Sequence, residues 1–154
     1  MILEVMKIKP VTECDDIDEL NYNVKMHREM VGQLMKIIGD YINYYGLKHD
    51  WTKTEHLQLF WEDVLARKNN SNISFTDREW GRLHTDNEHH HLNIKVEDNI
   101  TLIDILEFLC DCIITAKSTG QDIDSSLINL DSETLILAYN NTAKWLDNIT
   151  EVVK

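Results

Sequence analysis

Apolar and polar residues alternate along much of the chain with the period of an α-helix. Between residues 16 and 46, apolar side chains recur at alternating steps of three and four, which places them on one face of a long helix. Gly46 follows the last of them and matches a C-cap glycine. The same spacing turns His27 toward the apolar face, between Val24 and Val31, where a lone histidine is more often a hydrogen-bonded core residue than a ligand.

Pattern and capping signals predict three more main helices. Thr52 and Glu55 match a capping box, which predicts a helix over residues 53–68. A segment that is apolar on almost every side predicts a central helix over residues 100–117. A one-sided pattern predicts a covering helix over residues 132–153.

A short helix and an N-terminal arm complete the expected fold. Thr76 and Glu79 match a second capping box and start a short helix that carries His84. Residues 1–15 contain an apolar run closed by Pro10, which suits a strand or a packed arm. Gly and Pro are scarce, so all-β folds and disordered chains fit poorly. We therefore predict an all-α fold, a single-domain helical bundle of about five main helices.

Length and composition narrow the classes of function. The chain of 154 residues suits one domain, and no apolar run reaches the roughly 20 residues that span a bilayer. Its start lacks the pattern of a signal peptide, so we expect a cytoplasmic protein without a membrane partner. Three cysteines without CxxC spacing predict reduced thiols. A net charge of −12 argues against duplex nucleic acid, but a bound cation could still attract a small anion.

The predicted central helix carries one narrow polar stripe. Asp104, Glu107, Asp111 and Thr115 are spaced by three, four and four residues, so they share a face. If this face meets water, it is an ordinary solvated surface. If it meets the core, its carboxylates need a cation or a partner, because unpaired buried charge is costly. All seven histidines lie between positions 27 and 91, and they favour the second interpretation.

His49 and Asp50 are adjacent at the junction of two predicted helices, and imidazole and carboxylate suit the same mid-series divalent metals. His27, then His49 and Asp50, then Asp111 on a buried helix resemble the H…HD…D ligands of the HD-domain superfamily of metal-dependent phosphohydrolases. That resemblance implies a helical bundle in which these four residues bind a divalent metal.

A closer resemblance links most of the chain to a phage-associated and bacterial group of small, uncharacterised HD-like proteins. That group has an HDxSK motif, a W…H…HH segment and an acidic pattern of Glu and Asp. The matching residues are HDWTK over 49–53, then Trp80, His84, His90, His91, Glu107 and Asp111. Thr52 stands where the group usually has Ser, which keeps the hydroxyl. The resemblance implies the host cytoplasm for a phage-encoded chain and names no substrate.

Further roles follow from chemistry and from the resemblance. Four residues would bind a second metal, orient the first ligands or contact a phosphate: His84, His90, His91 and Glu107. HD-type nucleotidases commonly have an acidic residue where this chain has Lys53. A lysine at this position favours phosphate binding over proton abstraction. The cations available to neutralise a substrate phosphate are Lys53, Arg78, Arg82 and Lys117. The candidate general bases are Glu55, Asp104 and Glu107.

We therefore expect a divalent-metal-dependent phosphohydrolase that acts on a small nucleotide: a phosphomonoester, a triphosphate, or a cyclic or signalling nucleotide. It would use one or two ions of Mn, Fe, Co, Ni, Zn or Mg. The first alternative is a non-catalytic binding or inhibitor protein, with a structural metal or a site that sequesters a nucleotide. The second is oxygenation by an iron pair. Trp51, Trp61 and Trp145 would serve a homo-oligomer interface, a base-stacking wall or the core.

Overall fold

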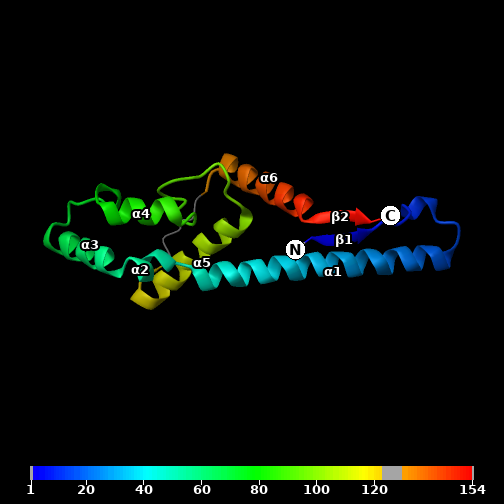
Figure 1. The fold of residues 1–154 in the computed structure, drawn as a ribbon, viewed down its shortest axis with the longest axis horizontal. Coiled ribbons are helices and arrows are strands. Elements are labelled where there is room, and N and C mark those ends of the chain that lie inside the picture. The colour runs from blue at the N-terminus through cyan, green and yellow to red at the C-terminus, as the bar shows by residue number, and fades with distance from the viewer. Residues whose placement is uncertain (1, 123–129, 154) are drawn as a thin grey trace. The chain divides into compact units, whose positions relative to one another are not determined.

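The computed structural model describes residues 2–122 and 130–153, and it confirms the all-α fold that the pattern predicts, with one small two-stranded sheet (Figure 1). In chain order the elements are β1 (Leu3–Met6), the 3-10 turn η1 (Val11–Glu13), α1 (Ile17–Lys48), α2 (Trp51–Glu55), α3 (Leu57–Asn69), the 3-10 turn η2 (Phe75–Asp77), α4 (Glu79–Asn87), α5 (Leu102–Thr119), α6 (Ser132–Asn148) and β2 (Thr150–Val153).

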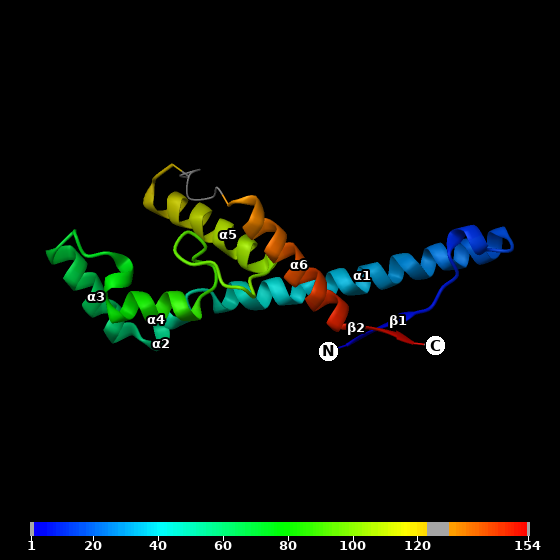
Figure 2. The same cartoon turned by 90° about the horizontal axis from the view of Figure 1, so that it is seen from above.

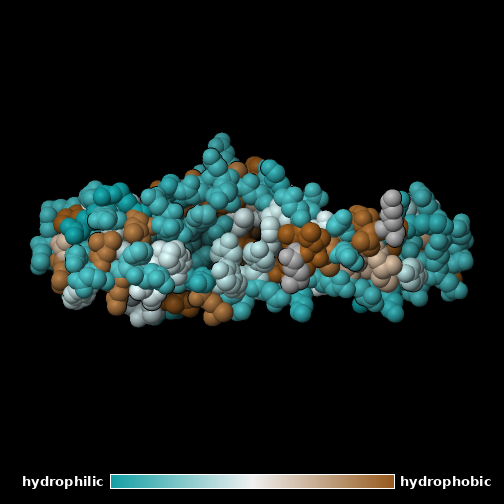
Figure 3. All heavy atoms as spheres, in the orientation of Figure 1, coloured by the Kyte–Doolittle hydropathy of each residue, from teal (hydrophilic) through white to brown (hydrophobic). Residues whose placement is uncertain are grey.

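Two compact units make up the chain. Unit 1 comprises Met1–Tyr44 and Thr142–Lys154, and unit 2 comprises Tyr45–Asn141. The single domain expected from the length stays a prediction. Among the described residues, no helix combines the length and the apolar character needed to cross a bilayer. Hydrophobic residues are interspersed among hydrophilic ones on the face shown in Figure 3.

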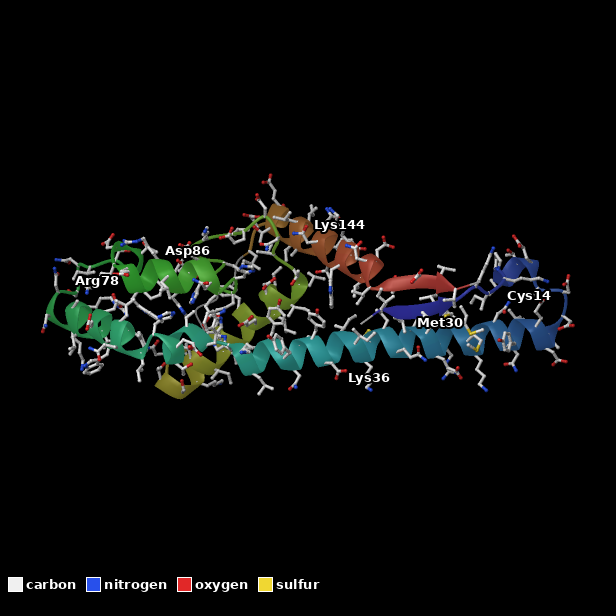
Figure 4. All side chains as sticks on the ribbon, in the orientation of Figure 1. Cys14, Met30, Lys36, Arg78, Asp86 and Lys144 are labelled. Carbon is white, nitrogen blue, oxygen red and sulfur yellow. The ribbon has the colours of Figure 1, made fainter. Side chains whose placement is uncertain are left out.

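In unit 1, the N-terminal arm pairs with the far end of the chain. β1 and β2 run parallel, with Met6 opposite Val153. The helix predicted over 132–153 therefore ends early, since α6 stops at Asn148 and the β-branched residues beyond it favour an extended backbone. The Met6 amide donates a hydrogen bond of 3.2 Å to Sδ of Met30, which holds β1 against α1 (Figure 4).

The long first helix ends later than its sequence suggests. α1 passes through Gly46 and continues to Lys48. The residue that takes the left-handed conformation is Asp50, with φ 58°. The prediction of a C-cap at Gly46 is therefore wrong. Asp is among the few non-glycine residues that adopt this conformation readily, so the chain turns at the position that also carries a candidate ligand.

Unit 2 has two helices where the sequence predicts one over residues 53–68. His56 interrupts the helix with φ −118° and ψ 38°, so that α2 precedes it and α3 follows. Thr52 lies inside α2 and is fully buried. Its predicted capping box with Glu55 does not form, because the Thr52 hydroxyl bonds to side chains of other elements.

α3 and α4 lie alongside each other in unit 2 (Figures 1 and 2). The buried carboxylate of Asp63 on α3 contacts Nε of Arg67 at 2.7 Å and Nε of Arg78 at 3.2 Å. The rings of Phe60 and Trp80 pack with their centroids 4.8 Å apart. One ion-pair cluster and one aromatic pair therefore join the two helices and position α4.

The turn before α4 is capped differently from the prediction. Ser74 and Asp77 form the capping box of η2, in place of the predicted pair Thr76 and Glu79. Glu79 is instead the first residue of α4. Both candidate boxes have the same spacing, and the one that forms starts the shorter turn.

The central helix predicted over residues 100–117 corresponds to α5. Thr101 caps its N-terminus in a capping box with Asp104, and Gly120 closes it in the left-handed conformation with φ 70°. Phe108 of α5 belongs to a buried apolar cluster together with Leu92, Ile100 and Ala138. This packing fixes the face of α5 that carries the acidic residues.

Candidate metal centre

Histidine and acidic side chains from four segments of unit 2 converge on one cluster. The turn between α1 and α2 supplies His49 and Asp50, and α4 supplies His84. The loop after α4 supplies His90 and His91, and α5 supplies Glu107 and Asp111. Within this cluster, three groups of side chains have ligand atoms within 4.8 Å of one another: Asp50, His84, His90 and His91; His49, His90 and Asp111; and Glu88, His90 and Glu107.

Asp50 lies at the junction of these groups. Its Oδ1 atom is 3.3 Å from Nε2 of His84 and 3.9 Å from Nε2 of His90, yet it is buried without a hydrogen-bond partner. Its Oδ2 atom lies 3.3 Å from Nε2 of His49 and also contacts Nζ of Lys53. Burial opposes the charge of this carboxylate, but its contacts with His49, His84 and Lys53 hold its pKa well below the usual range. Asp50 is therefore ionised.

His49 is surrounded by carboxylates. Its Nδ1 atom is 3.0 Å from Oε1 of Glu107, and its Nε2 atom is 3.4 Å from Oδ1 of Asp111. Asp111, then Asp50 and Glu107 raise the pKa of His49 to about 11. In return, His49 lowers the pKa of Asp111, and contacts with His49 and His90 bring the pKa of Glu107 to about 2 despite its burial. Without a metal, His49 carries the positive charge of this group.

His90 belongs to all three ligand groups. Its side chain is 1% exposed, and its Nδ1 atom lies 3.1 Å from Oε1 of Glu107 and 3.9 Å from Oε2 of Glu88. Neither ring nitrogen has a hydrogen bond of acceptable geometry, despite the short distance to Glu107. A buried imidazole without hydrogen bonds is unusual, and its lone pair suits a cation.

His91 completes the first group and remains neutral. Its Nε2 atom lies 2.7 Å from Nε2 of His84, and the His91 and His90 ring centroids are 4.2 Å apart. Burial, together with the adjacent His90 and His84, lowers the pKa of His91 to about 3. Metal ligation needs neutral imidazole, so no proton has to be removed from His91 at neutral pH.

The donor set fits a divalent transition-metal ion. Three imidazoles and one carboxylate face each other in the first group, and imidazole with carboxylate suits Zn, Fe, Co, Ni and Mn. The unpaired atoms Asp50 Oδ1 and His90 Nε2 are the polar atoms that such an ion would satisfy. The buried histidine and acidic groups are therefore compatible with a metal ion.

The pKa values predict that the metal-free protein is most stable near pH 6.5. The pKa of His49 is raised from 6.5 to about 11. Its contribution to the stability of the fold is therefore complete below pH 6.5 and is lost as the pH rises toward 11. The pKa of His91 is lowered from 6.5 to about 3. As the pH falls through this range, the unfolded chain binds a proton at His91 and the folded chain does not, so the stability falls. The pKa of Glu107 is lowered from 4.5 to about 2, so Glu107 adds to the loss of stability below pH 4.5.

Thermal unfolding in a chelating buffer at a series of pH values measures this dependence. Glu107→Gln is expected to flatten the decline below pH 4.5. Glu55→Gln is the matched control, because Glu55 is exposed on α2. A stability maximum at alkaline pH would contradict the charge assigned to His49.

His27 is not in the cluster. It lies in unit 1, where its side chain is exposed on α1, so the expectation that it faces inward is wrong. Periodicity shows which residues share a helix face, but not which face is covered. In unit 1, α1 is covered at other positions, at Met30 by β1 and at Tyr41 by α6. Of the four ligands that the HD resemblance implies, the structure brings His49, Asp50 and Asp111 together.

The predicted phosphate-binding cations occupy different environments. Lys53 is at the cluster, where its ammonium group pairs with Asp50. Arg82 is exposed, and its Nη1 donates to the carbonyl oxygens of Thr76 and Asp77 at 3.2 and 2.9 Å. Lys117 is exposed in the last turn of α5. Of these three, Lys53 is the cation in contact with a candidate ligand.

The candidate general bases also separate. Glu55 is exposed. Asp104 is buried, and its Oδ2 accepts 2.7 Å hydrogen bonds from the amide and the hydroxyl of Thr101, which assigns it to the helix cap. Glu107 alone of the three is in the cluster, facing His49 and His90. The acidic stripe therefore has two roles. Asp104 caps the N-terminus of α5 together with Thr101, and Glu107 and Asp111 face the histidines.

The sequence patterns did not identify Glu88 as a site residue, and they gave Thr52 no role at the site beyond its place in the HDWTK match. The Thr52 hydroxyl lies 2.5 Å from Nδ1 of His84 and donates to Oε1 of Glu88 at 2.9 Å. The same Oε1 accepts the Thr52 amide at 3.1 Å. The usable signal was Glu88 beside a run of three histidines, because a carboxylate there can orient an imidazole.

A cavity of about 210 Å³ opens beside the cluster. His91 and Asp111 form its boundary with the candidate ligands, and the other lining residues include Asn93, Phe108 and Gln121. None of the described residues that line it is Lys or Arg. It is smaller than a typical drug-sized binding site, and so it suits part of a small ligand.

No protein-family model, curated protein or solved structure that was compared with this chain matches it.

Proposed function

We propose that the chain is a divalent-metal-dependent phosphohydrolase that acts on a small nucleotide. The observation that carries this proposal is Oδ1 of Asp50, a buried carboxylate oxygen without a hydrogen-bond partner that faces the imidazoles of His84 and His90. A buried polar atom without a hydrogen bond is costly, and a cation held among these nitrogens would satisfy this oxygen. The resemblance of the HD pair to metal-dependent phosphohydrolases supplies the reaction class.

Asp50, His84, His90 and His91 would hold one ion. A second ion would take His49 and Asp111, and the two oxygens of Asp50 face the two groups. When bound, the metal polarises a phosphoryl oxygen and makes a bound water acidic near neutral pH. The residues present are sufficient for one ion and compatible with two.

Glu107 positions the imidazole of His49 in this proposal. A carboxylate whose pKa is about 2 accepts a proton poorly at neutral pH, so Glu107 is a weak general base. Its Oε1 atom instead lies within 3.1 Å of Nδ1 of both His49 and His90. The hydrogen bond between Glu107 and Nδ1 of His49 directs Nε2 of that ring toward Asp50 and Asp111.

The cavity beside His91 and Asp111 would receive the uncharged part of the substrate. Its amides, Asn93 and Gln121, can donate and accept hydrogen bonds with a base or a sugar, and Phe108 offers an apolar wall. Two carboxylates, Asp111 and Asp122, line it, so a phosphate is disfavoured inside. The phosphoryl group would then lie at the ligand cluster near Lys53.

Metal analysis of untagged protein tests the proposal. We expect one or two equivalents of a transition metal in wild type, and release of phosphate from nucleotides in the presence of Mn, Co, Ni or Mg. His91→Asn should reduce both, because it removes one imidazole of the first ligand group. His56→Asn is the matched control, since His56 is exposed between α2 and α3.

Two results would overturn the proposal. Wild type that binds no metal, even on titration, excludes the metal centre. Metal binding without hydrolysis of nucleoside monophosphates, triphosphates or cyclic nucleotides leaves a metal-binding protein that is not a phosphohydrolase.

A further inference from the structure

We propose that Thr52 and Glu88 are positioning residues that keep the proton of His84 on Nδ1, so that Nε2 presents a lone pair to the ligand cluster. The consequence for metal binding rests on the proposed function. The tautomer itself is a property of the metal-free chain and can be measured separately.

The three side chains form a closed, buried arrangement. Thr52 and His84 are fully buried, and Glu88 is 5% exposed. Oγ1 of Thr52 lies 2.5 Å from Nδ1 of His84 and 2.9 Å from Oε1 of Glu88. The His84 ring stacks on Trp80 with centroids 5.0 Å apart and an interplanar angle of 21°, which fixes the plane of the imidazole.

Proton counting assigns the tautomer. A hydroxyl has one hydrogen to donate, and an ionised carboxylate can only accept. Oε1 of Glu88 already accepts the backbone amide of Thr52, and the Thr52 hydroxyl donates to the same oxygen. Oγ1 of Thr52 is then an acceptor toward His84, so Nδ1 of His84 must carry the proton.

The other side of the His84 ring is compatible with this assignment. Nε2 of His84 lies 3.3 Å from Oδ1 of Asp50, and that oxygen has no hydrogen-bond partner. The contact between Nε2 and Oδ1 is therefore not a hydrogen bond, and it does not hold a proton on Nε2. With the proton on Nδ1, Nε2 accepts from His91 at 2.7 Å in the metal-free chain and is available to a cation.

The test reads the tautomer by two-bond ¹H–¹⁵N correlation spectra of the histidine rings, in protein treated with chelator. Wild type should show His84 protonated on Nδ1. Thr52→Val should populate the Nε2-protonated form, because valine matches threonine in shape but cannot accept from Nδ1. Thr52→Ser should keep the wild-type tautomer.

Metal affinity, measured by competition with a chromophoric chelator, provides the second readout. Thr52→Val should weaken binding by about 10- to 100-fold, and Thr52→Ser should restore it. Thr54→Val is the matched control on the same helix, because the Thr54 hydroxyl is exposed and bonds the Trp51 carbonyl.

The outcomes separate the two proposals. His84 protonated on Nε2 in wild type overturns the inference without reference to any metal. A shifted tautomer in Thr52→Val with unchanged metal affinity also overturns the positioning role. If wild type binds no metal while His84 shows the Nδ1 proton, the proposed function fails and the assignment of the tautomer holds.

Discussion

Asp50→Asn is expected to abolish metal-dependent phosphate release and to weaken metal binding by more than about 100-fold. Loss of a residue that only orients a ligand typically costs about 10- to 100-fold in metal affinity, and Asp50 is itself a candidate ligand. Its two oxygens face His84 and His90 on one side and His49 on the other. Replacing one of these oxygens by an amide nitrogen removes both the charge and a donor atom.

Asn is chosen because it leaves the backbone undisturbed. Asp50 has φ 58°, a left-handed conformation that Asn adopts at lower cost than Ala. Asp86→Asn is the matched control, because Asp86 is exposed on α4 and pairs with Lys95 at 3.0 Å (Figure 4). Metal content by elemental analysis and phosphate release are compared across wild type and both variants.

The result also separates an enzyme from a protein with a structural metal. Loss of turnover in Asp50→Asn, with the circular dichroism spectrum retained, supports catalysis. Wild type without turnover, combined with a large fall in the melting temperature of Asp50→Asn, supports a structural ion. Unchanged metal binding in Asp50→Asn would contradict the ligand assignment.

Local signals predicted the helices well because helical contacts are themselves local. The spacing of three and four that predicts a helix over 16–46 is satisfied by α1, and the segment over 100–117, apolar on almost every side, forms α5. β2 was missed because a strand is stabilised by a partner that is remote in sequence. Thr150–Val153 is extended through pairing with Leu3–Met6, and helix periodicity carries no information on such pairing.

Part of the candidate site followed from residue chemistry. His49 beside Asp50, and Glu107 and Asp111 on one face of α5, were predicted as ligands, and the structure brings them together. Thr52 was misinterpreted because its spacing from Glu55 fits a capping box equally well. Its partner Glu88 is 36 residues away, and no short-range signal joins the two. His27 was misplaced because a shared helix face does not reveal what covers it.

Gly81→Ala is expected to destabilise the protein by about 3 kcal/mol or more, which lowers the melting temperature by about 6–12 °C. A Cβ at Gly81 would overlap the carbonyl oxygen of Phe75, and it would lie 2.6 Å from that carbonyl carbon and 3.3 Å from the amide nitrogen of Thr76. These are backbone atoms of η2 and cannot rotate away as a flexible side chain could. The clash must be relieved by moving α4 or the turn.

The displacement should reach the cluster, because Gly81 lies one turn before His84 on α4. We therefore expect weaker metal binding in Gly81→Ala in addition to the lower melting temperature measured in chelator. Gly39→Ala is the matched control: Gly39 lies in the interior of α1 with nothing within 4 Å of an added Cβ. That change should stabilise by about 0.5–1 kcal/mol, since alanine favours helix over glycine. Equal melting temperatures for the two variants would contradict the close approach of α4 to η2. They would also contradict the conclusion that this contact positions His84.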